Sequence, residues 1–315
     1  MKIVVLDAAT LGADLDISPL YQVGQVTVYE NTAPTEVAGR IADQEVIVSN
    51  KIRLNAENLK DAKKLKLICL AATGYDCVDT AYCRENGIGV CNVPGYSTHS
   101  VAQLAVTMAL SLRTHLIPYR NFVHSGAYSR SGVANRLEPV WYELYGKTWG
   151  VVGGGNIGQE VAKITQALGC KVLMCRRKPD PNFETVDIDT LCRESDIISV
   201  HVALTEETRG MIGKKQIEQM KPDAVLINVA RGAVTDEKAL ADAIAENRLG
   251  GLGVDVYTEE PFGKDHPFQV ILDRPNVCLT PHMAWGASEA RNRCIAVVAE
   301  NIRAFSNGVR MNRVE

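Results

Sequence analysis

Residues 148–175, TWGVVGGGNIGQEVAKITQALGCKVLMC, decide the fold of the region around them. An apolar strand pattern runs directly into a glycine-rich turn of the form GxGxxG, a helical pattern follows, and KVLMC closes the unit as a second strand. Glycines let the backbone approach a pyrophosphate, and the N–H groups at the start of the helix bind its charge. Three glycines alone could simply make a turn, but the flanking strands and helix predict a dinucleotide site. Its expected residues are Gly153, Gly155, Asn156, Ile157 and Gly158.

Strand patterns on both sides of this unit predict an α/β protein with two doubly wound parallel-sheet domains. The later patterns lie at 196–202, 224–229, 251–256 and 276–280, which makes six candidate strands in a Rossmann nucleotide-binding domain. The earlier patterns lie at 3–6, 26–28, 46–49, 67–70 and 89–93 and indicate a flavodoxin-like substrate domain.

Two further segments set the expected domain boundaries. Residues 98–123 are predicted to form one long helix, and the segment after Pro281 contains an amphipathic helix with Ile295, Val298 and Ile302 at helical spacing. Since no later segment can pair with that last helix, we expect it to pack on the first domain. The predicted domains are therefore 1–98 plus 286–315, and 99–285. A ligand cleft is expected between them.

Composition excludes several classes of protein. With 46% hydrophobic and 23% charged residues the chain matches soluble globular averages, and a net charge of -3 offers no basic surface for nucleic acid. The nine cysteines are scattered without metal-ligand spacing, so we expect reduced thiols, a cytoplasmic location and no metal site. The N-terminus has the pattern of a first strand rather than a signal peptide, and no membrane span is expected.

The end of the second strand of the nucleotide unit carries the signal for cofactor choice. NAD-binding proteins of this type place an acidic residue there, whereas this chain has Arg176, Arg177 and Lys178. Cations at this point can bind the 2′-phosphate of NADP through charge-assisted hydrogen bonds. The sequence therefore predicts a preference for NADP(H), with NAD(H) possible. The alternative is a solvated basic turn that tolerates either cofactor.

Five motifs, in order and spacing, resemble those of the D-isomer-specific 2-hydroxyacid dehydrogenase family, and the resemblance extends along nearly the whole chain. The motifs are ATGYDCVD (72–79), NVPGY (92–96), VARG (229–232), DVYTEEP (255–261) and TPH (280–282). The resemblance implies a nicotinamide-dependent enzyme that reduces a small 2-oxo acid or oxidises the matching 2-hydroxy acid.

The resemblance assigns the catalytic set to Arg231, Glu260 and His282. The residue types suit the chemistry, because a guanidinium can hold a carboxylate in a bidentate fork and an imidazolium can donate to a carbonyl oxygen that gains charge. A neighbouring carboxylate favours the protonated imidazole. Glu259 is the alternative acid, and Glu260 is chosen because it precedes Pro261. Each residue alone could be a surface group, but all follow predicted strand ends, where ligands bind in such sheets.

Further positions follow from the same resemblance. Backbone N–H groups at Thr73 and Gly74 are expected to anchor the substrate carboxylate. Lys51 either reaches the same cleft or is an ordinary solvated lysine, and Trp285 either closes the substrate pocket or is a buried hinge residue. The residues expected to line the cofactor are His201, Val202, Thr208, Val229, Ala230 and Asp255, the last beside the nicotinamide carboxamide.

The motifs NKIRL (50–54), NVPGYST (92–98) and HMAW (282–285) look most like the glycerate dehydrogenase branch, which reduces hydroxypyruvate or glyoxylate to D-glycerate or glycolate. A phosphoglycerate dehydrogenase-like enzyme is one alternative, disfavoured because no regulatory domain follows the last helix. A nucleotide-sensing, corepressor-like binding protein is another. The resemblance also implies a homodimer formed through 98–123 and 124–145.

Overall fold

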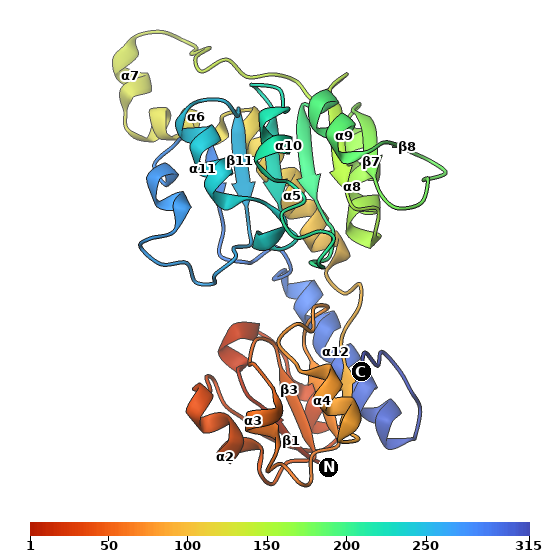
Figure 1. The fold of residues 1–315 in the computed structure, drawn as a ribbon. Coiled ribbons are helices and arrows are strands. Elements are labelled where there is room, and N and C mark those ends of the chain that lie inside the picture. The colour runs from red at the N-terminus through yellow and green to blue at the C-terminus, as the bar shows by residue number, and fades with distance from the viewer. The chain divides into compact units, whose positions relative to one another are not determined.

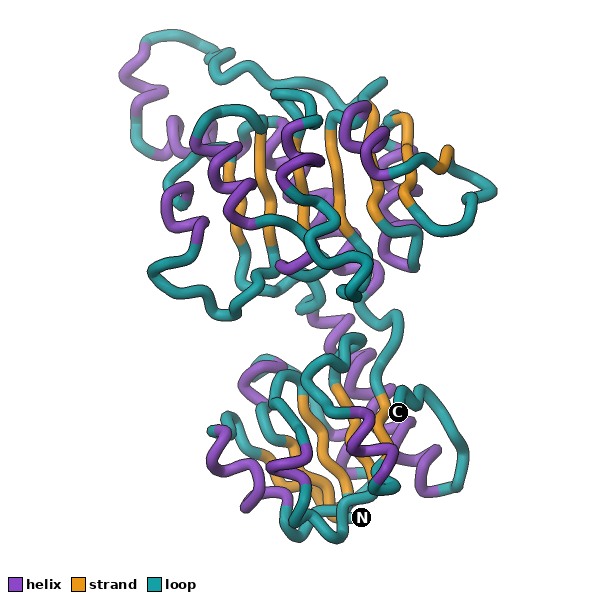
Figure 2. Tube along the Cα trace, viewed as in Figure 1, coloured by secondary structure: helices purple, strands orange, loops and turns teal.

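The computed structural model describes residues 1–315 and divides the chain into two compact units (Figure 1). Unit 1 comprises Met1–Ser97 and Trp285–Glu315, and unit 2 comprises Thr98–Ala284. Both boundaries lie one residue before those of the sequence-based division. Each unit contains its own parallel sheet with helices on both faces (Figure 2). None of the helices is both long and apolar enough to cross a lipid bilayer.

The sheet of unit 1 has the strand order β2-β1-β3-β4-β5, with every pair parallel. This is the flavodoxin-like order. The central strands β3 and β4 are fully buried, as expected for a parallel sheet covered on both faces. The strands are β1 (Lys2–Val5), β2 (Gln25–Val28), β3 (Val46–Ser49), β4 (Leu67–Leu70) and β5 (Gly89–Cys91).

The helix at the end of the chain, α12 (Ser288–Ser306), covers one face of this sheet. Its Ile295, Val298 and Ile302 are fully buried in one apolar cluster with Leu67 and Cys69 of β4, so the apolar stripe seen in the sequence is the contact face. The other helices of unit 1 are short: α1 (Ser18–Tyr21), α2 (Val37–Ile41), α3 (Ala56–Leu59), α4 (Thr80–Glu85), and the 3-10 turns η1 (Ala8–Leu11) and η2 (Pro34–Glu36).

The sheet of unit 2 has seven strands in the order β12-β11-β10-β9-β6-β7-β8, all parallel. The order is that of a Rossmann domain with one more strand at the edge. The predicted class, two parallel-sheet α/β domains, is therefore confirmed. The strands are β6 (Thr148–Val152), β7 (Lys171–Cys175), β8 (Glu184–Thr185), β9 (Ile197–Val200), β10 (Val225–Asn228), β11 (Gly251–Val254) and β12 (Val277–Leu279).

Two local predictions in unit 2 are wrong. The sequence indicates six strands, but β8 is a seventh whose two residues are too short to show a pattern. The single helix predicted for 98–123 is two, because His115 adopts a left-handed backbone (φ 50°) that ends one helix before the next begins.

The helices of unit 2 are α5 (Thr98–Arg113), α6 (Leu116–His124), α7 (Ala127–Ser131), α8 (Asn156–Ala167), α9 (Ile188–Glu194), α10 (Lys214–Glu218) and α11 (Glu237–Ala245), with 3-10 turns η3 (Gly232–Val234) and η4 (Pro267–Ile271).

Candidate functional site

Arg231 lies in a tight turn after β10, and a buried amide shapes this turn. Asn228, the last residue of β10, is fully buried. Its Nδ2 donates to the Arg231 carbonyl oxygen at 3.0 Å, and its Oδ1 accepts from the Ala230 N–H at 3.0 Å. The Arg231 guanidinium donates from Nη1 to the Ala230 carbonyl at 2.8 Å. The direction of the arginine is thus set by the strand end beneath it.

Gly232 brings the Arg231 turn into contact with the loop after β11. A Cβ at Gly232 would lie 2.1 Å from the carbonyl carbon of Tyr257 and 2.2 Å from the backbone nitrogen of Thr258. Heavy atoms do not approach so closely, so only glycine permits this backbone packing. The contact couples the position of Arg231 to the loop that carries Glu260.

Contacts to both carboxylate oxygens orient the Glu260 side chain. Oε1 accepts the backbone N–H of Tyr257 at 2.9 Å, and Oε2 lies 2.6 Å from Nδ1 of His282. The Tyr257 ring is buried beside Phe262, with its hydroxyl donating to the Thr280 carbonyl at 2.9 Å. Burial raises the pKa of Tyr257 above its ordinary value, so the phenol remains a donor.

His282 lies in the segment after β12, and Asp255 holds this segment. The Asp255 carboxylate is fully buried at the end of β11 and accepts the Thr280 hydroxyl at 2.5 Å and the N–H groups of Met283 and Ala284 at 2.9 and 2.8 Å. Burial raises the pKa of Asp255 despite these hydrogen bonds. His282 itself has a φ of 53°, a left-handed conformation uncommon for residues other than glycine.

The arrangement can hold an acid and move a proton. With Glu260 ionised, its carboxylate only accepts hydrogen bonds. In that state the Nδ1–H of His282 donates to Glu260, and proton exchange with a bound molecule would use Nε2. Strands β10, β11 and β12 are neighbours in the parallel sheet, so Arg231, Glu260 and His282 follow the carboxyl ends of adjacent strands. This is the edge where doubly wound sheets bind ligands.

The glycine-rich turn after β6 has the shape required for a dinucleotide. Gly153 has a φ of 105°, and a Cβ at Gly158 would lie 1.9 Å from the Gly153 carbonyl oxygen, so neither position tolerates a side chain. At Gly155, in contrast, a Cβ would meet nothing within 4 Å, and α8 begins at Asn156 without a side-chain cap. Open space beside uncapped N–H groups fits a pyrophosphate.

His201 follows β9 next to this turn and has an unmatched ring nitrogen. Its Nε2 lies 2.9 Å from the Ser199 hydroxyl, which also accepts from Trp149 Nε1 at 2.9 Å, whereas the buried Nδ1 has no partner in the protein. Burial lowers the pKa of His201 to about 3, so the ring is neutral. A buried nitrogen of this kind fits a polar group of a bound dinucleotide.

The other residues expected to line the cofactor differ in their surroundings. Val202 lies against Gly153, and Val229 and Ala230 are buried. The Thr208 hydroxyl donates to the Ala203 carbonyl at 2.6 Å and so stabilises its own loop.

The three cations after β7 do not share one environment. A Cβ at Gly154 would lie 2.8 Å from Cδ of Arg176, so the Arg176 side chain crosses the glycine-rich turn. The Arg176 guanidinium also contacts the carboxylate of Asp180, which is buried. Arg177 and Lys178 are exposed. Only Arg176 is therefore held beside the predicted cofactor site.

The expected substrate residues of unit 1 lie after β3 and β4 and just before α12. Lys51 is exposed, and its backbone N–H donates to the buried Asp7 carboxylate at 2.7 Å. Burial raises the pKa of Asp7. The Thr73 hydroxyl donates to the Val93 carbonyl at 2.8 Å, which shapes the turn that contains Gly74. Trp285 is half-buried, packs against the unit 1 core and makes an edge contact with Tyr96 at 6.4 Å between ring centroids.

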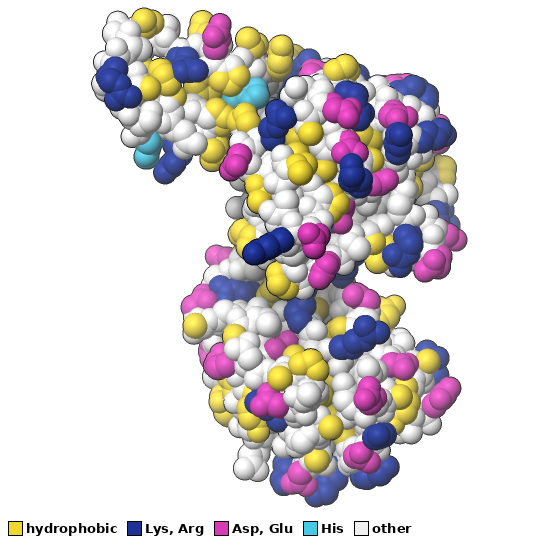
Figure 3. Space-filling model, turned by 60° about the vertical axis from the view of Figure 1, so that its left-hand side comes forward, with side chains coloured by type: hydrophobic (Ala, Val, Ile, Leu, Met, Phe, Trp, Pro, Cys, Tyr) yellow, Lys and Arg dark blue, Asp and Glu magenta, His cyan; other side chains and the backbone are white.

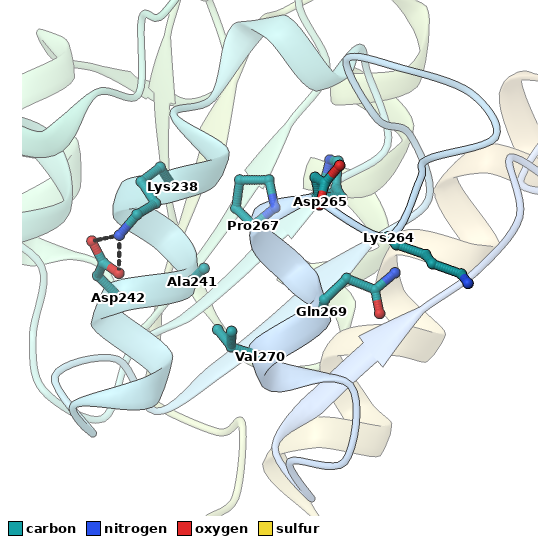
Figure 4. A pocket seen from close by; sticks show the side chains of 9 residues that line it. Lys238, Ala241, Asp242, Lys264, Asp265, Pro267, Gln269 and Val270 are labelled. Carbon is teal, nitrogen blue, oxygen red and sulfur yellow. Dashed lines mark hydrogen bonds and ion pairs between the residues drawn. The ribbon is translucent and has the colours of Figure 1, made fainter.

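A cavity of about 330 Å³ lies elsewhere in unit 2, between α11 and η4 (Figure 4). Lys238 and Asp242 lie on its wall, and the Lys238 ammonium contacts both oxygens of that carboxylate at 2.5 and 2.6 Å. None of the residues predicted for the site lines this cavity, and Lys238 and Asp242 on its wall pair with each other. It carries no part of the chemistry described above.

Sequence reasoning missed the residues that orient the predicted set. No motif indicates a ligand contact for Asn228, Tyr257 or Thr280. Their hydrogen bonds nevertheless orient Arg231, Glu260 and the segment that contains His282. A polar residue at the end of an otherwise apolar strand, such as Asn228 in VLIN, is the signal that could have identified the first of them.

Comparison with known proteins places this chain in one family. Residues 106–284 match the model of the D-isomer specific 2-hydroxyacid dehydrogenase, NAD binding domain. A glycerate dehydrogenase of Methylorubrum extorquens is 37% identical over 100% of this chain and 99% of its own length, and a hydroxypyruvate reductase of Blautia hydrogenotrophica is 35% identical over the same shares. A solved acyclic imino acid reductase in complex with NADPH and D-Arg superposes with a TM-score of 0.87 at 30% identity, with 100% of both chains covered. The chain therefore belongs to the D-isomer specific 2-hydroxyacid dehydrogenase family and is an NAD(P)-dependent oxidoreductase.

Proposed function

We propose that this dehydrogenase reduces hydroxypyruvate or glyoxylate to D-glycerate or glycolate, with NADP(H) as the preferred cofactor and NAD(H) as a possible one. The contact between His282 Nδ1 and Glu260 Oε2 at 2.6 Å, beside the strand end that carries Arg231, is the observation on which the proposal rests. The names of the glycerate dehydrogenase and hydroxypyruvate reductase relatives support the choice of substrate.

In this reaction the chain's own residues orient the acid and supply the proton. Arg231 binds the substrate carboxylate and the carbonyl oxygen, which fixes the carbonyl carbon. When bound, the nicotinamide supplies the hydride. His282 donates its Nε2 proton to the oxygen that becomes the hydroxyl, and Glu260 stabilises the imidazolium before transfer. Oxidation of the hydroxy acid uses the same groups in the opposite sense.

The proposal gives unit 1 the remaining contacts to the substrate. The N–H groups of Thr73 and Gly74 bind the carboxylate, Lys51 adds positive charge, and Trp285 closes the pocket over the small substrate. The family motifs that contain these residues support the assignment, as does their position after β3 and β4 or next to α12.

Preference for NADP(H) has two supports. The end of β7 has no acid, and Arg176 lies across the glycine-rich turn. Within the cofactor site, Gly153, Gly155, Asn156, Ile157 and Gly158 bind the pyrophosphate. Asp255 lies near the nicotinamide carboxamide, and Arg177 and Lys178 add positive charge near the 2′-phosphate. The remaining proposed contacts to the cofactor are those of His201, Val202, Thr208, Val229 and Ala230.

We further propose that the enzyme is a cytoplasmic homodimer. Apolar side chains are exposed on α6 and the segment after α7, and they gather on this part of unit 2 in Figure 3. Leu137 and Tyr145, 73% and 80% exposed, belong to this group, and exposed apolar side chains that gather in one patch mark an interaction surface. All nine cysteines are unpaired, which suits a reducing compartment. Light scattering at a mass near twice 34.3 kDa would support the dimer, and a monomer would contradict it.

Steady-state assays with both reduced cofactors test the proposed function. The substrates are hydroxypyruvate, glyoxylate, pyruvate and 3-phosphohydroxypyruvate. We expect the highest kcat/KM for hydroxypyruvate or glyoxylate, and about tenfold or more in favour of NADPH over NADH, since charge-assisted hydrogen bonds to the 2′-phosphate contribute about 1.5–3 kcal/mol each. A higher value for 3-phosphohydroxypyruvate would overturn the substrate, and a tenfold preference for NADH would overturn the cofactor. Absence of turnover with every acid would favour a binding protein.

A further inference from the structure

The carboxylate of Asp180 is buried in the loop after β7, and all of its contacts are inside the protein. Its side chain is only 1% exposed. Oδ2 contacts both Nη1 of Arg176 and Nε2 of Gln159, and Oδ1 accepts the Asn182 N–H at 3.0 Å. Burial opposes ionisation, but these hydrogen bonds hold the pKa of Asp180 below its ordinary value. Asp180 is thus a buried anion with three donors.

These contacts connect two parts of the predicted cofactor site. Gln159 lies in the first turn of α8, directly after the glycine-rich turn, and Arg176 follows β7. The Arg176 side chain crosses Gly154, where its Cδ and Nε lie 2.8 and 3.0 Å from the position of a Cβ. Asp180 therefore connects the guanidinium to α8, the helix whose N-terminus is proposed to bind the pyrophosphate.

Asp180 does not have the geometry of the acid that NAD-binding domains use for the ribose hydroxyls. That acid must offer its oxygens to the ligand. Both oxygens of Asp180 are already bonded within the protein, and the side chain has almost no contact with solvent. Its role must act through Arg176.

We propose that Asp180 is a positioning residue that holds Arg176 in place to bind the 2′-phosphate, and so sets the discrimination between NADP and NAD. This inference rests on the NADP preference proposed above. A free arginine side chain loses much rotamer freedom on binding, whereas one fixed beforehand loses little. The opposing effect, repulsion between Asp180 and a phosphate, is weakened because Arg176 and two further donors neutralise the carboxylate.

Calorimetric binding of 2′,5′-ADP and 5′-AMP tests this without turnover. In the wild type, 2′,5′-ADP is expected to bind more tightly. Asp180→Ala should weaken 2′,5′-ADP about tenfold, the effect of losing one preorganised charged contact, and leave 5′-AMP within about twofold. Asp180→Asn, whose amide oxygen still accepts from Arg176, should restore most of the affinity. Glu184→Ala, which removes a negative charge from nearby β8, is the matched control and should change neither ligand.

The steady-state counterpart separates positioning from other roles. Asp180→Ala should raise KM for NADPH about tenfold and leave kcat and the NADH parameters within about twofold, because only the 2′-phosphate contact changes. Tighter binding of 2′,5′-ADP by Asp180→Ala would overturn the inference, since Asp180 would then be a simple counter-charge. Equal losses for both nucleotides would also overturn it, because the role would be structural.

A double-mutant cycle identifies the route of the effect. If Asp180 acts through Arg176, then Arg176→Ala and Arg176→Ala/Asp180→Ala bind 2′,5′-ADP equally. Additive losses would contradict the inference. The ratio of the wild-type affinities for 2′,5′-ADP and 5′-AMP separates the two proposals. Equal affinities overturn the NADP preference and the inference together. A high ratio that Asp180→Ala leaves unchanged overturns only the role of Asp180.

Discussion

Gly232 and Tyr257 lie in direct backbone contact: a Cβ on Gly232 would come within 2.1 Å of the carbonyl carbon of Tyr257. The first residue follows Arg231, and the second lies in the loop that carries Glu260. The two halves of the proposed chemistry, carboxylate binding and proton transfer, therefore share one packing contact between neighbouring strand ends.

Gly232→Ala is expected to separate these strand ends. The methyl group would push the Tyr257–Thr258 backbone away, at a cost of about 1–3 kcal/mol in stability, and kcat/KM should fall at least about a hundredfold because the reacting groups are displaced. Gly263→Ala is the matched control, since a Cβ there meets nothing within 4 Å. Thermal melting and steady-state kinetics check both variants. Wild-type kinetics in Gly232→Ala would contradict the coupling.

Gly155→Ala tests the cofactor turn without disturbing the fold. The space at this position is open in the protein, so the melting temperature should not change. The methyl group would occupy the place proposed for the pyrophosphate, and KM for NADPH should rise about tenfold or more, because a dinucleotide needs close backbone approach. Gly39→Ala in α2, where a Cβ also meets nothing within 4 Å, should leave KM as it is. An unchanged KM in Gly155→Ala would place the dinucleotide elsewhere.

The choice between the two adjacent acids is open to a direct comparison. Glu260→Gln removes the negative charge at 2.6 Å from His282 Nδ1, and kcat should fall about 10- to 100-fold, less than the roughly 10²- to 10⁴-fold expected when the acid itself is lost, because His282 remains. Glu259→Gln should remain within about threefold of the wild type, because Glu260 supplies the contact to His282. Parallel pre-steady-state and steady-state rates measure this. The reverse order of effects would reassign the acid to Glu259.

The neutral His201 ring makes a prediction about pH and stability. Its pKa is about 3 in the folded protein, against an ordinary 6.5 in an unfolded chain. Below pH 6.5 the unfolded chain binds a proton that the folded protein does not, so stability falls as the pH drops toward 3. Between pH 7 and pH 5 the loss is about 1–2 kcal/mol.

His201→Asn removes the histidine and with it this pH-dependent loss of stability. From pH 7 to pH 5 the urea midpoint of the wild type should therefore fall more than that of the variant. All other groups titrate in both proteins and cancel in this comparison. A difference that does not depend on pH would show that His201 is protonated normally in the folded state.

The two parallel-sheet α/β domains could be predicted from the sequence because their strands show local patterns. Apolar runs at 46–49 and 67–70 are fully buried strands. The glycine spacing at 153–158 predicts a turn in which side chains would collide with neighbouring atoms. Motif order likewise indicated Glu260 and His282 as a pair, and the structure joins them at 2.6 Å.

Interactions between distant segments could not be predicted in this way. No pattern shows that the Asp255 carboxylate holds the Met283 and Ala284 amides, or that Asp180 binds Arg176 rather than solvent, because these contacts depend on how loops fold back on the sheet. The break at His115 was missed because a left-handed residue inside an apolar helical pattern leaves the periodicity intact.

The rate of proton-coupled reduction in His282→Asn tests the central claim most directly. Asparagine tolerates the left-handed backbone at this position and cannot act as the acid. Single-turnover reduction of hydroxypyruvate by NADPH should slow about 10²- to 10⁴-fold, with NADPH affinity unchanged, while His99→Asn on the exposed face of α5 reacts like the wild type. A His282→Asn rate within about threefold of the wild type would mean that another group supplies the proton, and the proposed catalytic set would have to be abandoned.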